Sequence, residues 1–174
     1  SDVAPLEVLP RAREAAQRAI DANPDLAEAQ FALGYMDWLL EWDWPAAETA
    51  FRRAVDLDPR YAWALISLGH SLSQSGRHSE ALAAMRRARE LDPQNAMSHA
   101  LSSQVAFQAR DYQAALDHAR QAIALDQDLW IGYAMRGQAL EQSGQTQLAL
   151  DALAIAARFS SDNSKPVATR GYIL

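Results

Sequence analysis

Cysteine is absent from this chain of 174 residues. Disulfides, thiolate nucleophiles and cysteine metal ligands are therefore excluded, and neither an oxidising nor a reducing compartment is disfavoured. The chain also lacks any apolar run near the roughly 20 residues that a membrane-spanning helix needs. Its N-terminus, SDVAPLEV, has no basic region followed by an apolar core, as a signal peptide would. These absences favour a soluble, cytoplasmic chain with no membrane partner.

Basic residues are few as well. The chain has 16 Lys and Arg against 22 Asp and Glu, which gives a formal net charge of −6. The basic residues are scattered along the sequence rather than clustered. A nucleic-acid groove needs a basic stripe that displaces counterions from phosphates. The sequence therefore predicts no nucleic-acid partner.

Catalytic and cofactor motifs are missing from the sequence. The histidines, His70, His78, His99 and His118, include no pair at the i, i+4 spacing of a helical metal site. Neither a GxGxxG sequence nor a Walker-type phosphate loop occurs, and no serine lies in a glycine elbow. We therefore expect a protein that is not an enzyme and that holds no metal and no cofactor.

Small residues, in contrast, recur at a spacing of about 34 positions in three separate series. The first alanine series is Ala12, Ala47, Ala81, Ala115 and Ala149, and the second is Ala19, Ala54, Ala88, Ala122 and Ala156. The third series is Gly34, Gly69, Ser103, Gly137 and Gly171. Coincident series at one spacing indicate a repeated structural unit.

Each unit has the apolar pattern of two amphipathic helices, with glycine in the turns QSGR (74–77) and QSGQ (142–145). One helix pair cannot bury its own apolar face, so neighbouring pairs must stack. The predicted helices are 10–22, 27–40, 45–57, 61–74, 78–91, 95–108, 112–125, 129–142 and 146–159, with another beginning near 164.

These residues resemble the tetratricopeptide repeat family. Its consensus is matched in full by one unit, at Leu65, Leu68, Gly69, Leu72, Ala81, Met85, Ala88 and Pro93. Other units depart from it, with Asp37 at an apolar position, Ser103 for glycine, Arg136 for leucine, and Gln127 and Ser161 for proline. The resemblance implies an all-α fold, a right-handed superhelix of antiparallel helix pairs. It divides a single domain, 1–174, into a half-repeat at 10–24, full repeats at 27–59, 60–93, 94–127 and 128–161, and a truncated first helix at 164–174.

A narrower resemblance concerns the string WDWPAAETAFRRAVDLDP, residues 42–59. It is similar to the opening repeat of tetratricopeptide regions attached to bacterial winged-helix transcriptional regulators and adenylate cyclases. This resemblance implies a regulatory module excised from a larger bacterial signalling protein.

The same string contains an extra residue, because the first pair is one residue longer than the others. We expect this residue in the turn around Glu41 to Trp44. Trp44 then aligns with Tyr112, an aromatic residue at the start of a second helix, and we expect its role to be structural. Pro45 takes the first helical position, where its missing amide hydrogen costs nothing. Trp42 either caps this turn or projects outward.

The resemblance also implies that the first helix of each pair lines a concave groove that binds a peptide or helix segment of a protein partner. The candidate groove residues are Glu28, Phe31, Tyr35, Trp38, Trp63, Ile66, His70, Met97, Gln104, Phe107, Ile131, Gln138 and Glu141. Phe31, Ile66 and Met97 could equally be core residues, whereas Gln104 and Gln138 are stronger candidates for binding. Family members that hold a chaperone's C-terminal carboxylate use Lys or Arg with Asn at concave positions, and this pattern is missing here.

Two other functions remain open at the sequence level. Repeat ends that expose apolar faces could pair, which would make the chain a self-associating module and a homo-oligomer. A related hairpin repeat reads one RNA base per unit, and the acidic net charge disfavours this alternative.

Overall fold

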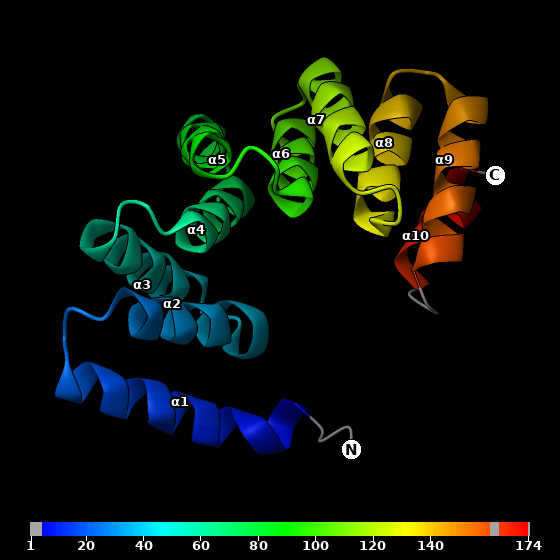
Figure 1. The fold of residues 1–174 in the computed structure, drawn as a ribbon. Helices are drawn as coiled ribbons and strands as arrows, with labels where there is room; N and C mark the ends of the chain where they lie inside the picture. Colours follow the sequence, from blue (N-terminus) through cyan, green and yellow to red (C-terminus); the bar gives the residue numbers. More distant parts are fainter. Residues whose placement is uncertain (1–4, 161–163, 174) are drawn as a thin grey trace.

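A computed structural model describes residues 5–160 and 164–173. The helices are α1 (Pro5–Ala22), α2 (Ala27–Met36), the π-helix η1 (Asp37–Glu41), α3 (Trp44–Leu57), α4 (Ala62–Gln74), α5 (His78–Leu91), α6 (Ala96–Gln108), α7 (Tyr112–Leu125), α8 (Trp130–Gln142), α9 (Thr146–Phe159) and α10 (Ser164–Ile173). Antiparallel pairs stack along an arc from α1 to α10 (Figure 1). The fold is a superhelix of helix pairs, which confirms the fold class predicted from the sequence.

The first helix begins earlier than its predicted start at residue 10. It runs from Pro5 through Pro10 to Ala22. Proline cannot donate a backbone hydrogen bond, and the sequence pattern therefore places Pro10 at a helix start. In the structure Pro10 lies in the N-terminal half of the helix. Its missing amide hydrogen therefore removes one backbone hydrogen bond of the helix close to the N-terminal end.

The extra residue of the first pair lies in a π-helix and not in the turn around Glu41 to Trp44 as the sequence suggested. At the ends of α4, α6 and α8, backbone bonds of 2.9 Å close the chain over five residues: Arg77 N to Leu72 O, Asp111 N to Ala106 O and Gln145 N to Leu140 O. The equivalent bond in the first pair, Asp43 N to Asp37 O at 3.0 Å, spans six residues. A π-helical turn inserts one residue into an α-helix, so η1 takes up the insertion.

Every first helix in these pairs ends with a residue in the left-handed conformation. These residues are Trp42, Gly76, Arg110 and Gly144, with φ of 57°, 76°, 62° and 74°. Each lies two residues before a second helix begins. Glycine adopts this conformation freely, whereas a side chain with a Cβ is strained by about 1–2 kcal/mol. Trp42 is therefore a bulky residue at a position suited to glycine.

Four residues of the third sequence series, Gly34, Gly69, Ser103 and Gly137, lie where two helices of a pair cross, whereas a Cβ on Gly171 would meet nothing within 4 Å. A Cβ added to Gly137 would lie 2.6 Å from Cγ of Leu153 and 3.2 Å from the carbonyl oxygen of Ala149. Ser103 replaces this glycine in α6, and its Oγ donates a 2.7 Å hydrogen bond to the carbonyl oxygen of Ala115. The hydroxyl thus uses the close approach that would crowd a methyl group.

The buried apolar residues form two clusters that meet near the boundary between α5 and α6. One cluster extends over α3, α4 and α5 and includes Val105. The other extends over α6, α7, α8 and α9. Near this boundary, four polar residues of α5, α6 and α7 contact one another in pairs: Arg89 with Ser102, and His99 with His118. We call these four residues the polar junction. The positions 34 residues earlier hold Val55, Leu65, Leu68 and Ala84.

The polar junction is held together by contacts among its own members. Arg89 Nη1 donates a hydrogen bond to Ser102 Oγ, and the rings of His99 and His118 lie 6.2 Å apart. Burial, followed by the positive charges of Arg89 and His99, lowers the pKa of His118 to about 4. Burial also lowers the pKa of His99 and of Arg89. Burial beside a guanidinium group therefore disfavours protonation of both imidazoles.

Across residues 5–160 and 164–173, no helix combines the length and the apolar composition needed to cross a bilayer.

Candidate functional site

The inner face of the arc is formed by the first helices of the pairs, and α4 illustrates how their side chains divide. Trp63, Ile66 and His70 line pockets on one side of α4. Leu65, Leu68 and Leu72 line a depression on the opposite side. At 100° per residue these two sets point in opposite directions from the helix axis. The side of α4 with Trp63 and His70 is the concave groove.

Three neighbouring pockets lie in this groove, and all three are lined by His70. The Trp63 pocket, with a volume of about 320 Å³, is lined by Tyr35, Trp38, Trp63, Ile66, Ser67, His70, Met97 and Leu101. The Trp42 pocket, with a volume of about 560 Å³, is lined by Trp38, Leu39, Trp42, Trp44, His70, Gln74, Gln104 and Gln108. The Gln138 pocket, with a volume of about 340 Å³, is lined by His70, Leu101, Gln104, Trp130, Ile131, Ala134, Met135, Gln138, Pro166 and Thr169.

Trp38 separates the Trp63 pocket from the Trp42 pocket and lines both. Its ring meets that of His70 edge-on at 5.0 Å and that of Tyr35 at 6.1 Å. Its Nε1 donates a 3.3 Å hydrogen bond to Gln74 Oε1. These contacts hold the indole in one orientation, so the wall between the two pockets is preorganised.

Glutamines at the ends of the first helices connect neighbouring pairs. Gln74 accepts from Trp38, Gln108 accepts from Ser73 Oγ, and Gln142 accepts from Tyr112 at 3.4 Å. In each case the donor belongs to the preceding helix pair. Because the side-chain oxygens accept these bonds, the amide N–H groups of Gln74 and Gln108 are the donors that these residues can offer to the Trp42 pocket.

Charged residues are absent from the two central first helices. The helices α4 and α6, each 13 residues long, contain no Asp, Glu, Lys or Arg, although these types make up 22% of the chain. Near the Trp42 pocket, Asp37 of η1 is 7% exposed and pairs with Arg13 of α1. Arg13 also lies 2.9 Å from Glu41. The carboxylates of η1 thus face α1, and the groove floor is uncharged.

The structure brings nine of the thirteen candidate groove residues into the three pockets. These are Tyr35, Trp38, Trp63, Ile66, His70, Met97, Gln104, Ile131 and Gln138. Ile66 is only 2% exposed, so it forms the floor of the Trp63 pocket as a core residue. The others of this group have side chains with greater access to the groove, except His70, which is also buried.

The remaining four candidates, Glu28, Phe31, Phe107 and Glu141, line none of these three pockets. Phe31 packs against the rings of Tyr61 at 5.1 Å and Phe51 at 5.8 Å, within the first apolar cluster. Phe107 packs against Tyr112 at 5.6 Å and against the second cluster. Glu28 lies near Tyr61, whose pKa is raised by burial and then by the charges of Glu28 and Asp58.

Sequence reasoning missed several pocket residues. Trp44 begins α3, as its alignment with Tyr112 predicts, yet its side chain is 44% exposed and lines the Trp42 pocket. Trp42 projects outward and is 72% exposed. Gln74 and Gln108 could have been found, because they recur at the 34-residue spacing next to predicted groove positions. Leu39 and Trp42 had no such signal, because their placement depends on the π-helical turn.

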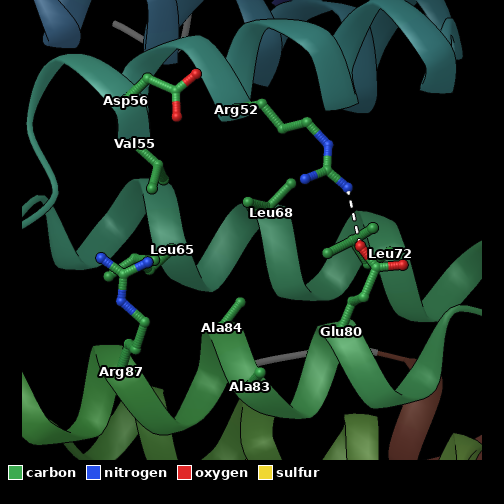
Figure 2. Close-up of a pocket in the computed structure, with 10 residues that line it drawn as sticks. All are labelled: Arg52, Val55, Asp56, Leu65, Leu68, Leu72, Glu80, Ala83, Ala84 and Arg87. Atoms are coloured by element: carbon green, nitrogen blue, oxygen red, sulfur yellow. Dashed lines mark hydrogen bonds and ion pairs between the residues drawn. The ribbon is translucent and has the colours of Figure 1, made fainter.

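A fourth pocket, of about 340 Å³, lies on the outer side of α4, between α3 and α5 (Figure 2). Its floor is formed by the core residues Leu65, Leu68 and Leu72. Arg52 and Glu80 meet across its rim at 3.3 Å, as the dashed line in Figure 2 shows. Glu48 holds Arg52 and Arg77 at 2.8 and 2.6 Å. Arg52 and Glu80 are therefore paired with each other, and Arg87 donates a 3.3 Å hydrogen bond to the carbonyl oxygen of Pro59. The groove, with its exposed tryptophans, is the stronger candidate site.

No cluster of three or more His, Asp or Glu side chains suited to a metal ion occurs in the parts of the chain that the structure describes.

Comparison with known proteins identifies the repeat. Two family models, each described as tetratricopeptide repeat, match residues 39–105 and 101–164. No curated protein matches the chain. Among solved structures, TTC0263, a thermophilic TPR protein of Thermus thermophilus, is similar with a TM-score of 0.80 and 20% identity over 97% of this chain and 91% of that one.

Two further structures are similar at the level of the fold. MamA gives a TM-score of 0.70 with 23% identity, covering 90% of this chain and 91% of that chain. YrrB, described as a TPR protein with an unusual peptide-binding site, gives 0.71 with 17% identity, covering 95% and 85%. The matched repeats, the stacked helix pairs and these similarities agree, and the chain belongs to the tetratricopeptide repeat family.

Proposed function

We propose that this chain is a non-catalytic scaffold that binds a peptide or helix segment of a partner protein in its concave groove. Tetratricopeptide repeats generally mediate contacts between proteins and are typically not catalytic. The observation that carries the proposal for this chain is the placement of tryptophan. All five tryptophans of the chain line one of the three groove pockets.

Exposed tryptophan at such a site has a physical meaning. Trp42, Trp44 and Trp63 are 72%, 44% and 46% exposed, although their rings are large and mostly apolar. Clustered apolar exposure marks interaction sites, and tryptophan dominates the binding energy of many interfaces because it removes a large area from water. The pocket volumes lie at the size of ordinary ligand sites, roughly 300–1,000 Å³.

The experiment that tests this function is selection of peptides by the intact chain from a random displayed library, followed by calorimetric titration of a selected peptide. A groove variant, Trp63→Ala with Gln104→Ala, is compared with Leu148→Ala. Leu148 is 48% exposed on α9 and lines none of the groove pockets described above. We expect the groove variant to weaken binding at least about tenfold and the control to change it less than about twofold.

Equal binding by the intact chain and the groove variant would contradict the proposal, provided that both are equally helical and monodisperse. Failure to select any peptide above background would contradict it as well, because a preformed groove of this size should capture some apolar sequence.

The resemblance of segment 42–59 supports a finer proposal, that the scaffold is a regulatory module of a larger bacterial signalling protein. This proposal expects the encoding reading frame to continue into a winged-helix or cyclase domain. A reading frame that encodes only the repeats would contradict it.

Self-association is the competing function, and one observation favours it. Val167 of α10, at the C-terminal end of the arc, is 59% exposed. If the ends pair, light scattering should give a mass that rises with concentration, and Val167→Glu should return it to the monomer value. A constant monomer mass would remove this alternative.

A further inference from the structure

We propose that the Trp63 pocket and the Trp42 pocket together form the anchor site of the groove, and that they accept two bulky, uncharged side chains from a partner segment that carries no charge between them. This inference rests on the proposed function and adds the chemical class of the segment and the half of the groove where it is anchored.

The first support is the uneven distribution of aromatic side chains along the groove. Four of the five tryptophans line the two pockets formed by α2, η1, α3, α4 and α6, and Trp130 lines the Gln138 pocket farther along. The Trp63 pocket is walled chiefly by apolar atoms of Trp63, Met97 and Leu101. The Trp42 pocket adds amides of Gln74, Gln104 and Gln108. The N-terminal half of the groove thus offers the larger area for apolar burial.

The second support is the preorganisation of the wall between the two pockets. Trp38 is fixed by its hydrogen bond to Gln74 and by its edge contact with His70. A partner side chain can therefore enter on either side of this indole without first ordering it, and less entropy is lost on binding. Two pockets that share one fixed wall fit two side chains of the same segment.

The third support is the strained conformation of Trp42. The equivalent positions in two other pairs are glycines, which adopt this backbone conformation without strain. Trp42 nevertheless keeps its φ of 57° and leaves its ring 72% exposed. Strained residues and π-helical turns are concentrated at functional sites. The insertion in η1 and the left-handed Trp42 together form the outer wall of the Trp42 pocket.

The charge of the segment follows from the floor of the groove. Because α4 and α6 contain no Asp, Glu, Lys or Arg, a partner charge buried between the two pockets would find no opposite charge on them. An ion that loses its water without gaining a partner is strongly disfavoured. The uncharged groove therefore favours a partner segment that is itself uncharged. The competing occupant is a lysine or arginine side chain stacked on the tryptophans, since indole faces attract cations.

The test uses the intact chain and a random library of displayed peptides about 12 residues long. A selected peptide is titrated in about 50 and about 500 mM NaCl, because exposed charge pairs weaken over this range and apolar contacts do not. Each bulky side chain of the peptide is then replaced by lysine, and the measurements are repeated on Trp63→Ala and Trp42→Ala. Trp130→Ala makes the same change in another part of the groove, and Leu148→Ala is the control outside the groove pockets.

We expect dissociation constants that differ less than twofold between the two salt concentrations, and at least a tenfold loss for each lysine replacement. The loss should shrink on the tryptophan variant whose pocket receives that side chain, which is the signature of a direct contact. Trp130→Ala should weaken binding less than either anchor variant does, and Leu148→Ala should change it less than twofold.

Selection of lysine or arginine at the anchor positions, or a tenfold weakening at high salt, would overturn the uncharged anchor while the groove function stands. A larger loss for Trp130→Ala than for Trp63→Ala and Trp42→Ala would overturn its location. Binding that none of these variants changes would contradict the groove function itself. Because Trp42 is largely exposed, Trp42→Ala keeps the test decisive even if Trp63→Ala loses helicity.

Discussion

Trp42 and Gly76 occupy equivalent positions before a second helix, and both have positive φ, at 57° and 76°. For glycine the conformation is ordinary, but for tryptophan it brings Cβ close to the following carbonyl oxygen. The local backbone at residue 42 therefore opposes the side chain that the chain carries there. Stability and the shape of the Trp42 pocket make opposite demands at this residue.

Trp42→Gly is expected to raise the free energy of unfolding by about 0.5–1 kcal/mol, because relief of the strain outweighs the greater freedom of glycine in the unfolded chain. Urea denaturation followed by circular dichroism measures this change. Gly76→Ala is the matched control and should lower the free energy of unfolding by about 1 kcal/mol, since nothing crowds its Cβ and the strain acts alone. A loss of more than about 1 kcal/mol for Trp42→Gly would show that its ring stabilises the turn.

At Gly137 the constraint is space and not backbone conformation. Gly137→Ala should destabilise the protein by about 1–3 kcal/mol, because the new methyl group overlaps Leu153 and forces repacking. Thermal unfolding of this variant is compared with that of Gly171→Ala, whose Cβ meets nothing within 4 Å. The control should be neutral or slightly more stable, since alanine favours a helix. Equal melting temperatures for the two variants would refute the role of close packing.

Among elements, the contact between α5 and the pair α6 and α7 differs from its counterpart one repeat earlier. Arg89, His99, Ser102 and His118 occupy positions at which Val55, Leu65, Leu68 and Ala84 lie one repeat before. The charged groups that act on His118 are Arg89, His99, Asp117 and Asp111, and Arg86 and Glu90 act on Arg89. The two carboxylates nearest His118 oppose the shift without cancelling it. Because burial lowers the pKa of His99 and His118, the stability of this junction depends on pH.

Stability should fall as the pH drops from about 6.5 to about 4. The pKa of His118 is lowered from 6.5 in the unfolded chain to about 4 in the folded one, so the unfolded chain binds more protons in this window. The loss from this group reaches at most about 3 kcal/mol and levels off below pH 4, and His99 contributes in the same direction. Urea unfolding at several pH values measures it.

The double variant His99→Leu, His118→Ala should lose about 2–3 kcal/mol less than the wild type over the same interval. Both replacements are found at equivalent positions of the preceding repeat, Leu65 and Ala84, so the fold accommodates them. The comparison of variant with wild type removes the contribution of the carboxylates, which titrate in both. Parallel pH curves for the two proteins would rule out the junction as the cause.

For the whole molecule, the division of the apolar core into two clusters sets how the superhelix unfolds. Repeat proteins are stabilised by contacts between neighbouring units, so a weak contact between two units limits cooperativity. The first cluster extends over α3, α4 and α5 and includes Val105 of α6, the second extends over α6 to α9, and Leu82 packs against both. At the polar junction, Arg89, His99, Ser102 and His118 stand at positions that hold the apolar residues Val55, Leu65, Leu68 and Ala84 one repeat earlier.

We expect unfolding at about pH 5 to depend on the probe. Trp38, Trp42, Trp44 and Trp63 precede the junction and Trp130 follows it, so tryptophan fluorescence reports mainly on the N-terminal part. Circular dichroism reports on all helices. The two transitions should separate in urea at this pH and approach each other in the double histidine variant. Coincident transitions in the wild type would mean that the stack unfolds as one unit.

Much of this architecture was determined by the sequence itself. The 34-residue recurrence of alanine and glycine predicted stacked helix pairs, because small residues are needed wherever two helices cross closely. The helix predicted at 61–74 is α4 (Ala62–Gln74), which begins one residue later than predicted. The helix predicted at 146–159 is α9 (Thr146–Phe159), whose bounds agree with the prediction. Periodic apolar patterns report directly which face of a helix is buried.

Only the tertiary structure decided where the insertion lies and which side chains share a pocket. A sequence shows that the first pair has one extra residue, but whether a turn or a helix absorbs it depends on packing against α1 and α3. That choice turns Leu39 and Trp42 toward Gln74 and Gln108 of later helices. Trp38 and Phe31 both lie on the predicted concave face and both pack against the first cluster, but only Trp38 lines the groove pockets. Pocket membership depends on contacts between residues far apart in the chain, and local periodicity contains no information about them.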